Sequence, residues 1–179
     1  MNIESSYSER RAPNRSARTA AAAVLSVIAL ASVWLATQVI NPSAVRNGGL
    51  LPAIQFLSID GQSQTVSARP DERTVILLVQ SQCGHCGYEL DELERKISDI
   101  ADLHLYVLST EQNFFAAGYL DRFPKLRASS SVSIGVVDRA SFERALGVLV
   151  TPALFVFDER GRLVKSFRGE TKIDAFVTN

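Results

Sequence analysis

Short apolar runs alternate along the chain with stretches in which apolar residues recur every three or four positions. The runs at 74–79, 103–108 and 132–137 are continuous, which is typical of strands buried on both faces of a sheet. The residues that follow the first run have the spacing of an amphipathic helix. The whole pattern predicts strands at 53–59, 64–67, 74–79, 103–108, 132–137, 153–157 and 163–167, and helices at 84–100, 112–122, 139–146 and 171–177.

Turn and stop signals separate these elements. Asp60-Gly61 and the segment 158–161 are typical of tight turns between antiparallel strands. We expect Pro124 to end the helix before it, and Gly147 to end the helix at 139–146. Strands that alternate with helices and close with a hairpin predict an α/β layered sandwich of about 130 residues.

The first forty residues differ from the rest because a basic cluster precedes a long uncharged stretch. Four arginines lie between positions 10 and 18, and no further charge occurs before Arg46. As a helix, residues 19–40 would be about 33 Å long, enough for a hydrocarbon core of about 30 Å. The arginines favour a cytoplasmic amino terminus, and Trp34 lies toward the far end, where an indole suits the headgroup region.

This arrangement divides the chain into four parts. We interpret residues 1–18 as a cytoplasmic basic segment, 19–40 as a single transmembrane anchor in the cytoplasmic (inner) membrane, 41–50 as a linker, and 51–179 as a domain in the periplasm or another extracytoplasmic space. A cleaved signal peptide is one alternative, but the apolar stretch exceeds the usual roughly 7–15 residues and no good small-x-small site follows. The other is a helix of a soluble core, which the flanking arginines and the glycines after the stretch disfavour.

The composition excludes several classes of function. The 19 basic and 19 acidic residues balance, so no overall charge favours nucleic acid as a partner. Two cysteines and two histidines exclude a disulfide-rich scaffold and a four-cysteine zinc or iron–sulfur site within one chain. One methionine and 8% aromatic residues leave little for a Met-rich copper site or a base-stacking platform. We therefore expect no cofactor and no resident metal.

The cysteine pair carries the candidate chemistry. Cys83 and Cys86 follow a buried strand, precede a helix, and are close enough at helical spacing to form a disulfide. Backbone N–H groups at the helix start stabilise a thiolate, so we expect Cys83 to be the exposed nucleophile. Cys86, one turn deeper, is the expected resolving thiol. A protonated His85 would add a positive charge that favours thiolate over disulfide.

A structural disulfide and half of a metal site are the alternatives for this pair. A structural bridge does not need a helix start, and so short a loop gives little chain-entropy stabilisation. A metal site within one chain would also need His85 or His104, and the apolar flanks of His104 indicate a packed core residue. We favour a redox-active pair because its strand-to-helix context is specific.

The segment QSQCGHC at 80–86, with Val150-Thr151-Pro152 some 65 residues later, resembles the thioredoxin superfamily. The opening LP…F…DG from residue 51 and the closing TPALFVFD from residue 151 resemble its membrane-anchored TlpA/ResA branch, over roughly residues 50–170. The resemblance implies a thioredoxin-like three-layer sandwich, with a central mixed sheet flanked by helices. It also implies a cis peptide bond before Pro152, beside the disulfide, with the backbone of Thr151 free to pair with a substrate peptide.

The same resemblance assigns further residues to the site. Glu89 lies three residues after Cys86, where the ResA-like branch carries an active-site glutamate that can take the proton of the resolving thiol. A solvated acid in the first helical turn is the alternative for Glu89. Gln82, Gly84 and Thr151 are the expected substrate contacts, although Gln82 replaces the Trp usual in the superfamily. Thioredoxin's buried Asp is absent, and His85 replaces its Pro, so the direction of electron flow stays open.

These observations predict a membrane-tethered thiol–disulfide oxidoreductase that exchanges its disulfide with protein thiols outside the cytoplasm. The family suggests reduction, for example in the maturation of cytochrome c or another metalloprotein, which would require a transmembrane electron-donor protein. A disulfide oxidase or isomerase with the same residues is the nearest alternative, and metal delivery by the CxxC pair is less favoured. A peroxidase of the peroxiredoxin type would need a Pro-x-x-x-Thr-x-x-Cys motif, and none is present before Cys83.

Overall fold

The computed structural model describes residues 26–30, 32, 45–100, 102–114, 118–147 and 150–177, and it comprises two compact units, Met1–Asn41 and Pro42–Asn179. In the first unit the described residues are helical, and the hydroxyl of Ser32 donates to the carbonyl of Ile28. The basic segment and most of the expected membrane span at 19–40 lie outside the described residues. Within the described ranges, no helix combines the length and the apolar character that crossing a membrane requires.

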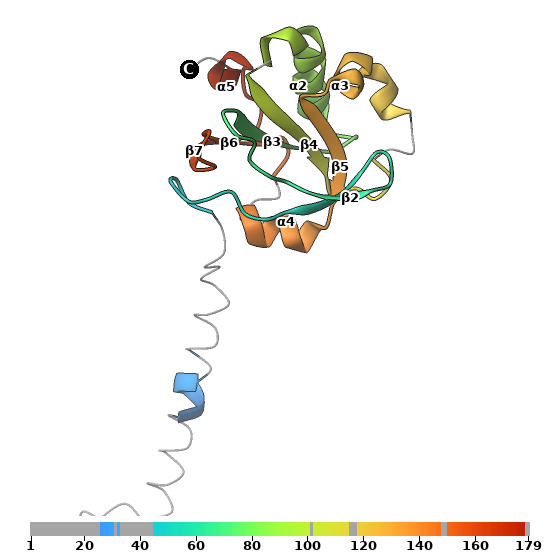
Figure 1. Ribbon diagram of the computed structural model, residues 1–179. Helices are drawn as coiled ribbons and strands as arrows, with labels where there is room; N and C mark the ends of the chain where they lie inside the picture. Colours follow the sequence, from blue (N-terminus) through green and yellow to red (C-terminus); the bar gives the residue numbers. More distant parts are fainter. Residues whose placement is uncertain are drawn as a thin grey trace, which may run out of the picture. The chain divides into compact units, whose positions relative to one another are not determined.

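The described part of the second unit is built on one seven-stranded mixed sheet, with strand order β2-β1-β5-β4-β3-β6-β7 (Figure 1). The strands β3, β4 and β5 are parallel to one another, and the remaining pairs are antiparallel. Every predicted strand is present, with small differences at the ends. The bounds are β1 Gln55–Ser58, β2 Ser63–Thr65, β3 Arg73–Val79, β4 Leu103–Ser109, β5 Val132–Val137, β6 Ala153–Phe157 and β7 Leu163–Arg168.

Helices cover both faces of this sheet and bury two apolar cores (Figure 1). One core joins side chains from α2 (Gly84–Arg95), α3 (Pro124–Ala128) and α5 (Asp174–Val177) with one face of the strands. The other joins α4 (Arg139–Leu146) with the opposite face. This arrangement is the thioredoxin-like α/β fold, with α2 following the inner strand β3, which lies between β4 and β6. Two short 3-10 helices complete the described elements, η1 at Ile97–Ile100 and η2 at Tyr119–Arg122.

The segment expected to be a helix at 112–122 is different in the structure. Among its described residues, only Tyr119–Arg122 are helical, as η2, and Gly118 before them has a φ of 66° that favours glycine. Helical structure does end before Pro124, as expected, since η2 stops at Arg122. The same proline also begins α3, which the pattern does not predict, because the first helical position needs no N–H donor and suits the φ of proline. The carboxylate of Glu94 accepts hydrogen bonds from the next two backbone N–H groups, which anchors α3 to α2.

Part of the segment interpreted as a linker at 41–50 is bound to the folded unit. The backbone N–H of Val45 donates to the carbonyl of Ala145, and that of Gly48 donates to the carbonyl of Leu163. Residue 50 also forms an isolated antiparallel bridge with Arg162. These bonds give the chain backbone partners before β1 begins, so its attachment to the domain starts earlier than the apolar pattern indicates.

Two predictions about single residues of this unit are confirmed. Gly147 ends α4 with a φ of 71°, a left-handed conformation in which glycine is the favoured residue. His104 is a core residue of β4, 1% exposed, with Nε2 2.9 Å from the hydroxyl oxygen of Ser133 and with no partner for Nδ1. Burial, with a smaller effect of Arg69, lowers the pKa of His104 to about 4, so the ring is neutral inside the domain.

Candidate active site

The cysteine pair lies where the inner strand β3 passes into α2. Cys83 is the N-cap of this helix, half-buried, and Cys86 lies in its first turn, fully buried, with a Cα–Cα distance of 5.2 Å across their disulfide. The backbone N–H of Cys86 donates to Sγ of Cys83 over 3.2 Å. The sulfur of Cys83 therefore lies at the electropositive end of α2, where a thiolate is stabilised.

The loop before β6 lies against the exposed sulfur. The peptide bond between Thr151 and Pro152 is cis, as the family resemblance implies, and Pro152 is buried. The carbonyl oxygen of Thr151 is 3.7 Å from Sγ of Cys83, and its hydroxyl donates to the side-chain oxygen of Gln80 over 3.1 Å. The structure thus brings Thr151 and Cys83 together, although 68 positions separate them in sequence.

The strand that leads into the cysteine motif is also fixed by a distant carboxylate. Glu111, shortly after β4, accepts a hydrogen bond of 2.9 Å from the backbone N–H of Ser81. Sequence reasoning did not identify Glu111 or Gln80 as part of the site. Neither residue belongs to a recognisable motif with its partner, because their contacts arise only when β3, β4 and β6 lie side by side.

Glu89 is a buried carboxyl group of α2, one turn after Cys86. It is 3% exposed; Oε1 accepts a hydrogen bond of 2.5 Å from the backbone N–H of Thr171, and Oε2 has no partner. Burial raises the pKa of Glu89 to about 7, although the hydrogen bond from Thr171 lowers it. The charge of Glu170 raises this pKa by a smaller amount, and His85 lowers it by a smaller amount. The alternative of a solvated acid is therefore wrong for Glu89, and a group of this pKa can hold or release a proton near neutral pH.

His85 lies on the outside of the motif. Its Nδ1 is 2.7 Å from Oε2 of Glu170, which precedes α5, and both side chains are largely exposed. The loop at 169–171 thus contacts the helix through His85 and Glu89. It also reaches the loop before β6, because the backbone N–H of Gly169 donates to the carbonyl of Pro152. Sequence reasoning gave no signal for Glu170 or Thr171.

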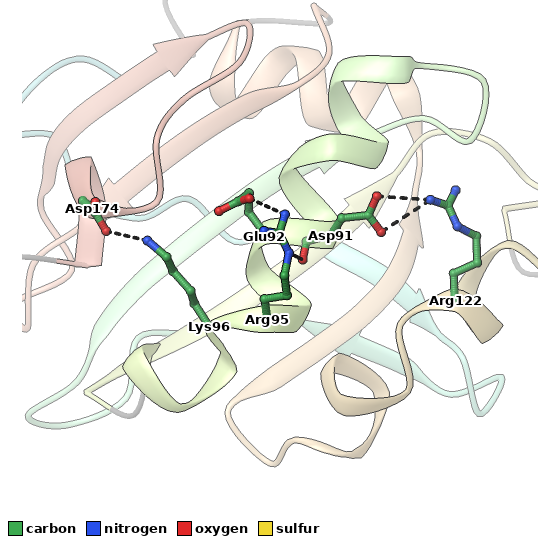
Figure 2. A network of polar contacts seen from close by, with 6 residues as sticks. All are labelled: Asp91, Glu92, Arg95, Lys96, Arg122 and Asp174. Carbon is green, nitrogen blue, oxygen red and sulfur yellow. Dashed lines mark hydrogen bonds and ion pairs between the residues drawn. The ribbon is translucent and has the colours of Figure 1, made fainter.

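Ion pairs on the outer face of α2 fix this helix relative to its neighbours. Figure 2 shows Asp91 paired with Arg122 of η2, and Lys96, the C-cap of α2, paired with Asp174 of α5 at 3.0 Å. Between them, Glu92 pairs with Arg95 on the same helix. Such exposed pairs contribute little to stability one by one. Their effect here is to join α2, which carries both cysteines, to elements on either side of it.

The expected substrate contacts Gln82 and Gly84 are both exposed beside Cys83. They border an open groove of about 420 Å³ that extends from Cys83 toward η2. A half-buried sulfur next to an open groove, with a buried partner sulfur and a buried carboxyl group behind it, is an arrangement suited to thiol–disulfide exchange. Within the described residues, no group of three or more His, Cys, Asp or Glu side chains is placed to hold a metal ion.

Comparison with known proteins agrees with this architecture. The family model described as Redoxin matches residues 46–178. None of the curated proteins compared with the chain matched it.

Three solved structures illustrate the likeness of fold. A peroxiredoxin-like protein from Aquifex aeolicus is 18% identical, with a TM-score of 0.61 over 75% of this chain and 85% of that one. A Chlorobium tepidum protein described as a thiol:disulfide interchange protein, DsbE, is 15% identical, with a TM-score of 0.60 over 73% of this chain and 91% of that one. Copper-bound ScoI from Arabidopsis thaliana is 12% identical, with a TM-score of 0.55 over 72% of this chain and 94% of that one.

Proposed function

The chain belongs to the Redoxin family, and on that basis we propose that it is a protein thiol–disulfide oxidoreductase whose reactive groups are Cys83 and Cys86. The observation that carries the proposal is the unequal exposure of the two sulfurs. Cys83 is accessible at the start of α2, whereas Cys86 is fully buried behind it. This asymmetry gives the two cysteines the separate roles of nucleophile and resolving thiol.

In the proposed reaction the reduced enzyme acts on a substrate disulfide. The thiolate of Cys83 attacks one substrate sulfur, the substrate S–S bond breaks, and the other substrate sulfur leaves as a thiolate. The thiol of Cys86 then loses its proton and attacks Sγ of Cys83. The mixed disulfide breaks, the second substrate thiolate leaves and takes up a proton, and the enzyme ends as the disulfide.

Glu89 is the proposed acceptor of the Cys86 proton. Both side chains are buried and lie three positions apart on α2, the spacing of neighbours on one helix face. A carboxyl group with a pKa of about 7 is about half ionised near neutral pH, which suits a group that must take and return one proton per cycle.

We also infer that the domain is tethered to a membrane and works as a reductase outside the cytoplasm, supplied with electrons by a transmembrane protein. The basic cluster before the uncharged stretch at 19–40 supports the tether, and the TlpA/ResA-like motifs support the direction. Retention of the full chain in membranes after alkaline carbonate extraction is the expected result for the tether. A reduction potential near thioredoxin's, about −270 mV, is expected for a reductase, and a value near about −120 mV would favour a disulfide oxidase.

Trapping with single cysteine variants tests the proposed division of roles. Reduced Cys86→Ser protein, mixed with a model protein that contains disulfide bonds, should accumulate a mixed disulfide through Cys83. The reason is that no thiol remains in the variant to release the partner. Cys83→Ser is the matched control and should form none. A pH of about 6 lies below the ordinary thiol pKa of about 8.5. Alkylation of the reduced protein at this pH should therefore label Cys83, the accessible thiolate, before Cys86. Faster labelling of Cys86, or trapping through Cys86, would refute the assignment.

A further inference from the structure

The register of β3 and β6 brings Gln80 and Thr151 opposite each other. The ladder between these strands ends with Leu78 opposite Ala153. Two positions beyond this pair, the same antiparallel register places Gln80 opposite Thr151. Pro152 lies between Thr151 and the ladder and has no N–H group to extend it. A bond between side chains joins the two segments at this point, because the hydroxyl of Thr151 donates to Oε1 of Gln80 over 3.1 Å.

Gln80 belongs to the side of this contact that other bonds already fix. Its backbone carbonyl accepts a hydrogen bond of 3.3 Å from the N–H of Cys83. The N–H of the next residue, Ser81, donates to the carboxylate of Glu111 over 2.9 Å. A substitution of the Gln80 side chain keeps these backbone bonds and removes the bond to Thr151.

The loop before β6 is the other side of the contact, and it faces the reactive sulfur. The carbonyl oxygen of Thr151 is 3.7 Å from Sγ of Cys83, so a substrate chain joined to that sulfur passes the backbone of Thr151. The N–H of Gly169 donates to the carbonyl of Pro152 over 2.8 Å and holds the loop from the side of β7. Gln80 holds the same loop from the side of the cysteine motif.

Resting on the proposed function, we propose that Gln80 is a positioning residue for substrate binding. Its side chain keeps Thr151 where the backbone of this residue pairs with the polypeptide that carries the substrate sulfur. Without the bond, the loop occupies that position for a smaller fraction of the time, and the apparent affinity for the chain falls by the same factor. A hydrogen bond between two neutral side chains supports a factor of about three to ten. A small disulfide has no chain to pair with Thr151, so its reaction with Cys83 does not depend on Gln80.

The test compares a peptide with a small substrate that contains the same reacting bond. The peptide has a single central cysteine, the small substrate is N-acetylcysteine amide, and each is joined to 5-thio-2-nitrobenzoate by a mixed disulfide. The Cys83 thiolate of the reduced protein attacks the substrate sulfur, the bond to the nitrobenzoate sulfur breaks, and the coloured nitrobenzoate thiolate leaves. Each second-order rate is divided by the rate of the same substrate with free glutathione, which removes differences in intrinsic reactivity.

On this corrected scale the wild-type protein should react faster with the peptide than with the small substrate. Gln80→Leu keeps most of the side-chain volume but loses the acceptor. It should slow the reaction with the peptide by about three- to ten-fold and leave the reaction with the small substrate unchanged. Gln64→Leu makes the same substitution at an exposed position of β2, at the far edge of the sheet, and as the matched control should change neither rate.

Variants of Thr151 show whether Gln80 acts through this residue. Thr151→Val removes the hydroxyl and should slow the reaction with the peptide as much as Gln80→Leu does. Thr151→Ser keeps a hydroxyl donor and should retain most of the wild-type rate. The double variant with Gln80→Leu and Thr151→Val should be no slower than either single variant, because both substitutions remove the same bond.

The two substrates together separate positioning from a general defect of folding, which would slow both reactions alike. Equal slowing of both substrates, an unchanged peptide rate in Gln80→Leu, or losses that add in the double variant would overturn the role of Gln80. A wild-type protein without any preference for the peptide would also overturn it, because no contact with the chain would then contribute to the reaction. If the reduced wild-type protein releases no nitrobenzoate from either substrate, the proposed function fails instead.

Discussion

The pKa values of Glu89 and His104 predict that protein stability will be nearly independent of pH between about 4.5 and 6.5. Burial raises the pKa of Glu89 from 4.5 to about 7 and lowers the pKa of His104 from 6.5 to about 4. In that interval the folded protein binds one proton, on Glu89. The unfolded chain also binds one, on His104. Because the slope of stability with pH depends on the difference in bound protons, the two contributions cancel.

Each group alone would give a slope, with opposite sign. Glu89 is protonated in the folded state but ionised in the unfolded state between 4.5 and about 7, so its contribution is present at low pH and is lost as pH rises through this interval. His104 is neutral in the folded state but protonated in the unfolded state between about 4 and 6.5, so its contribution is present at high pH and is lost as pH falls.

The magnitude follows from the size of the shifts. Each group alone would give a slope of stability of about 1.4 kcal/mol per pH unit. Solvent screens neither group appreciably, because Glu89 is only 3% and His104 only 1% exposed. Glu89→Gln removes one titration and should leave the His104 slope, so that stability rises by about 2 kcal/mol from pH 4.5 to 6.5. At pH 8 the variant should be more stable than the wild type, because it no longer ionises a buried carboxyl group.

Urea unfolding of the oxidised wild-type and Glu89→Gln proteins, at half-unit steps from pH 4.5 to 8, measures these slopes. His104→Gln is the reciprocal variant and should show stability that falls as pH rises from 4.5 to about 7. A wild-type slope of about 1 kcal/mol per pH unit in the predicted flat interval, or a Glu89→Gln protein without a slope there, would contradict these pKa values.

Three further substitutions test the packing of the domain by thermal or urea unfolding. Gly135→Ala should destabilise the domain by about 1–3 kcal/mol, because a Cβ atom there would meet the ring of Phe56 and, at 2.7 Å, the carbonyl oxygen of Leu57. Gly84→Ala is its control and should cost less stability, because a Cβ atom there meets nothing within 4 Å. Phe142→Ala should cost about 3–5 kcal/mol, because the ring is fully buried; an unchanged midpoint would contradict the assigned core. Glu94→Ala should cost about 1 kcal/mol by freeing the first N–H groups of α3, and Glu94→Gln should restore part of it.

The sequence predicts most of the fold because local signals and tertiary packing agree along the sheet. A continuous apolar run such as β3 can be satisfied only by burial on both faces, and Gly147 marks a helix end that its backbone conformation requires. At Pro124 the pattern marks the end of a helix but not the start of α3, although proline is compatible with both positions. The start of α3 depends on Glu94, 30 positions earlier, whose carboxylate accepts hydrogen bonds from its first N–H groups.

The candidate site divides in the same way between local and distant contributions. Cys83, Cys86 and Glu89 lie on one helix, so spacing alone relates them, and the helix start identifies which sulfur is accessible. Their chemistry nevertheless depends on groups from two other parts of the chain. Thr151 lies beside Cys83 because β6 pairs with β3, and the N–H of Thr171 reaches Glu89 because the chain returns over α2 after β7. Long-range pairing therefore determines how a common motif is tuned, since it decides both what contacts the reactive sulfur and how strongly the buried carboxyl group retains its proton.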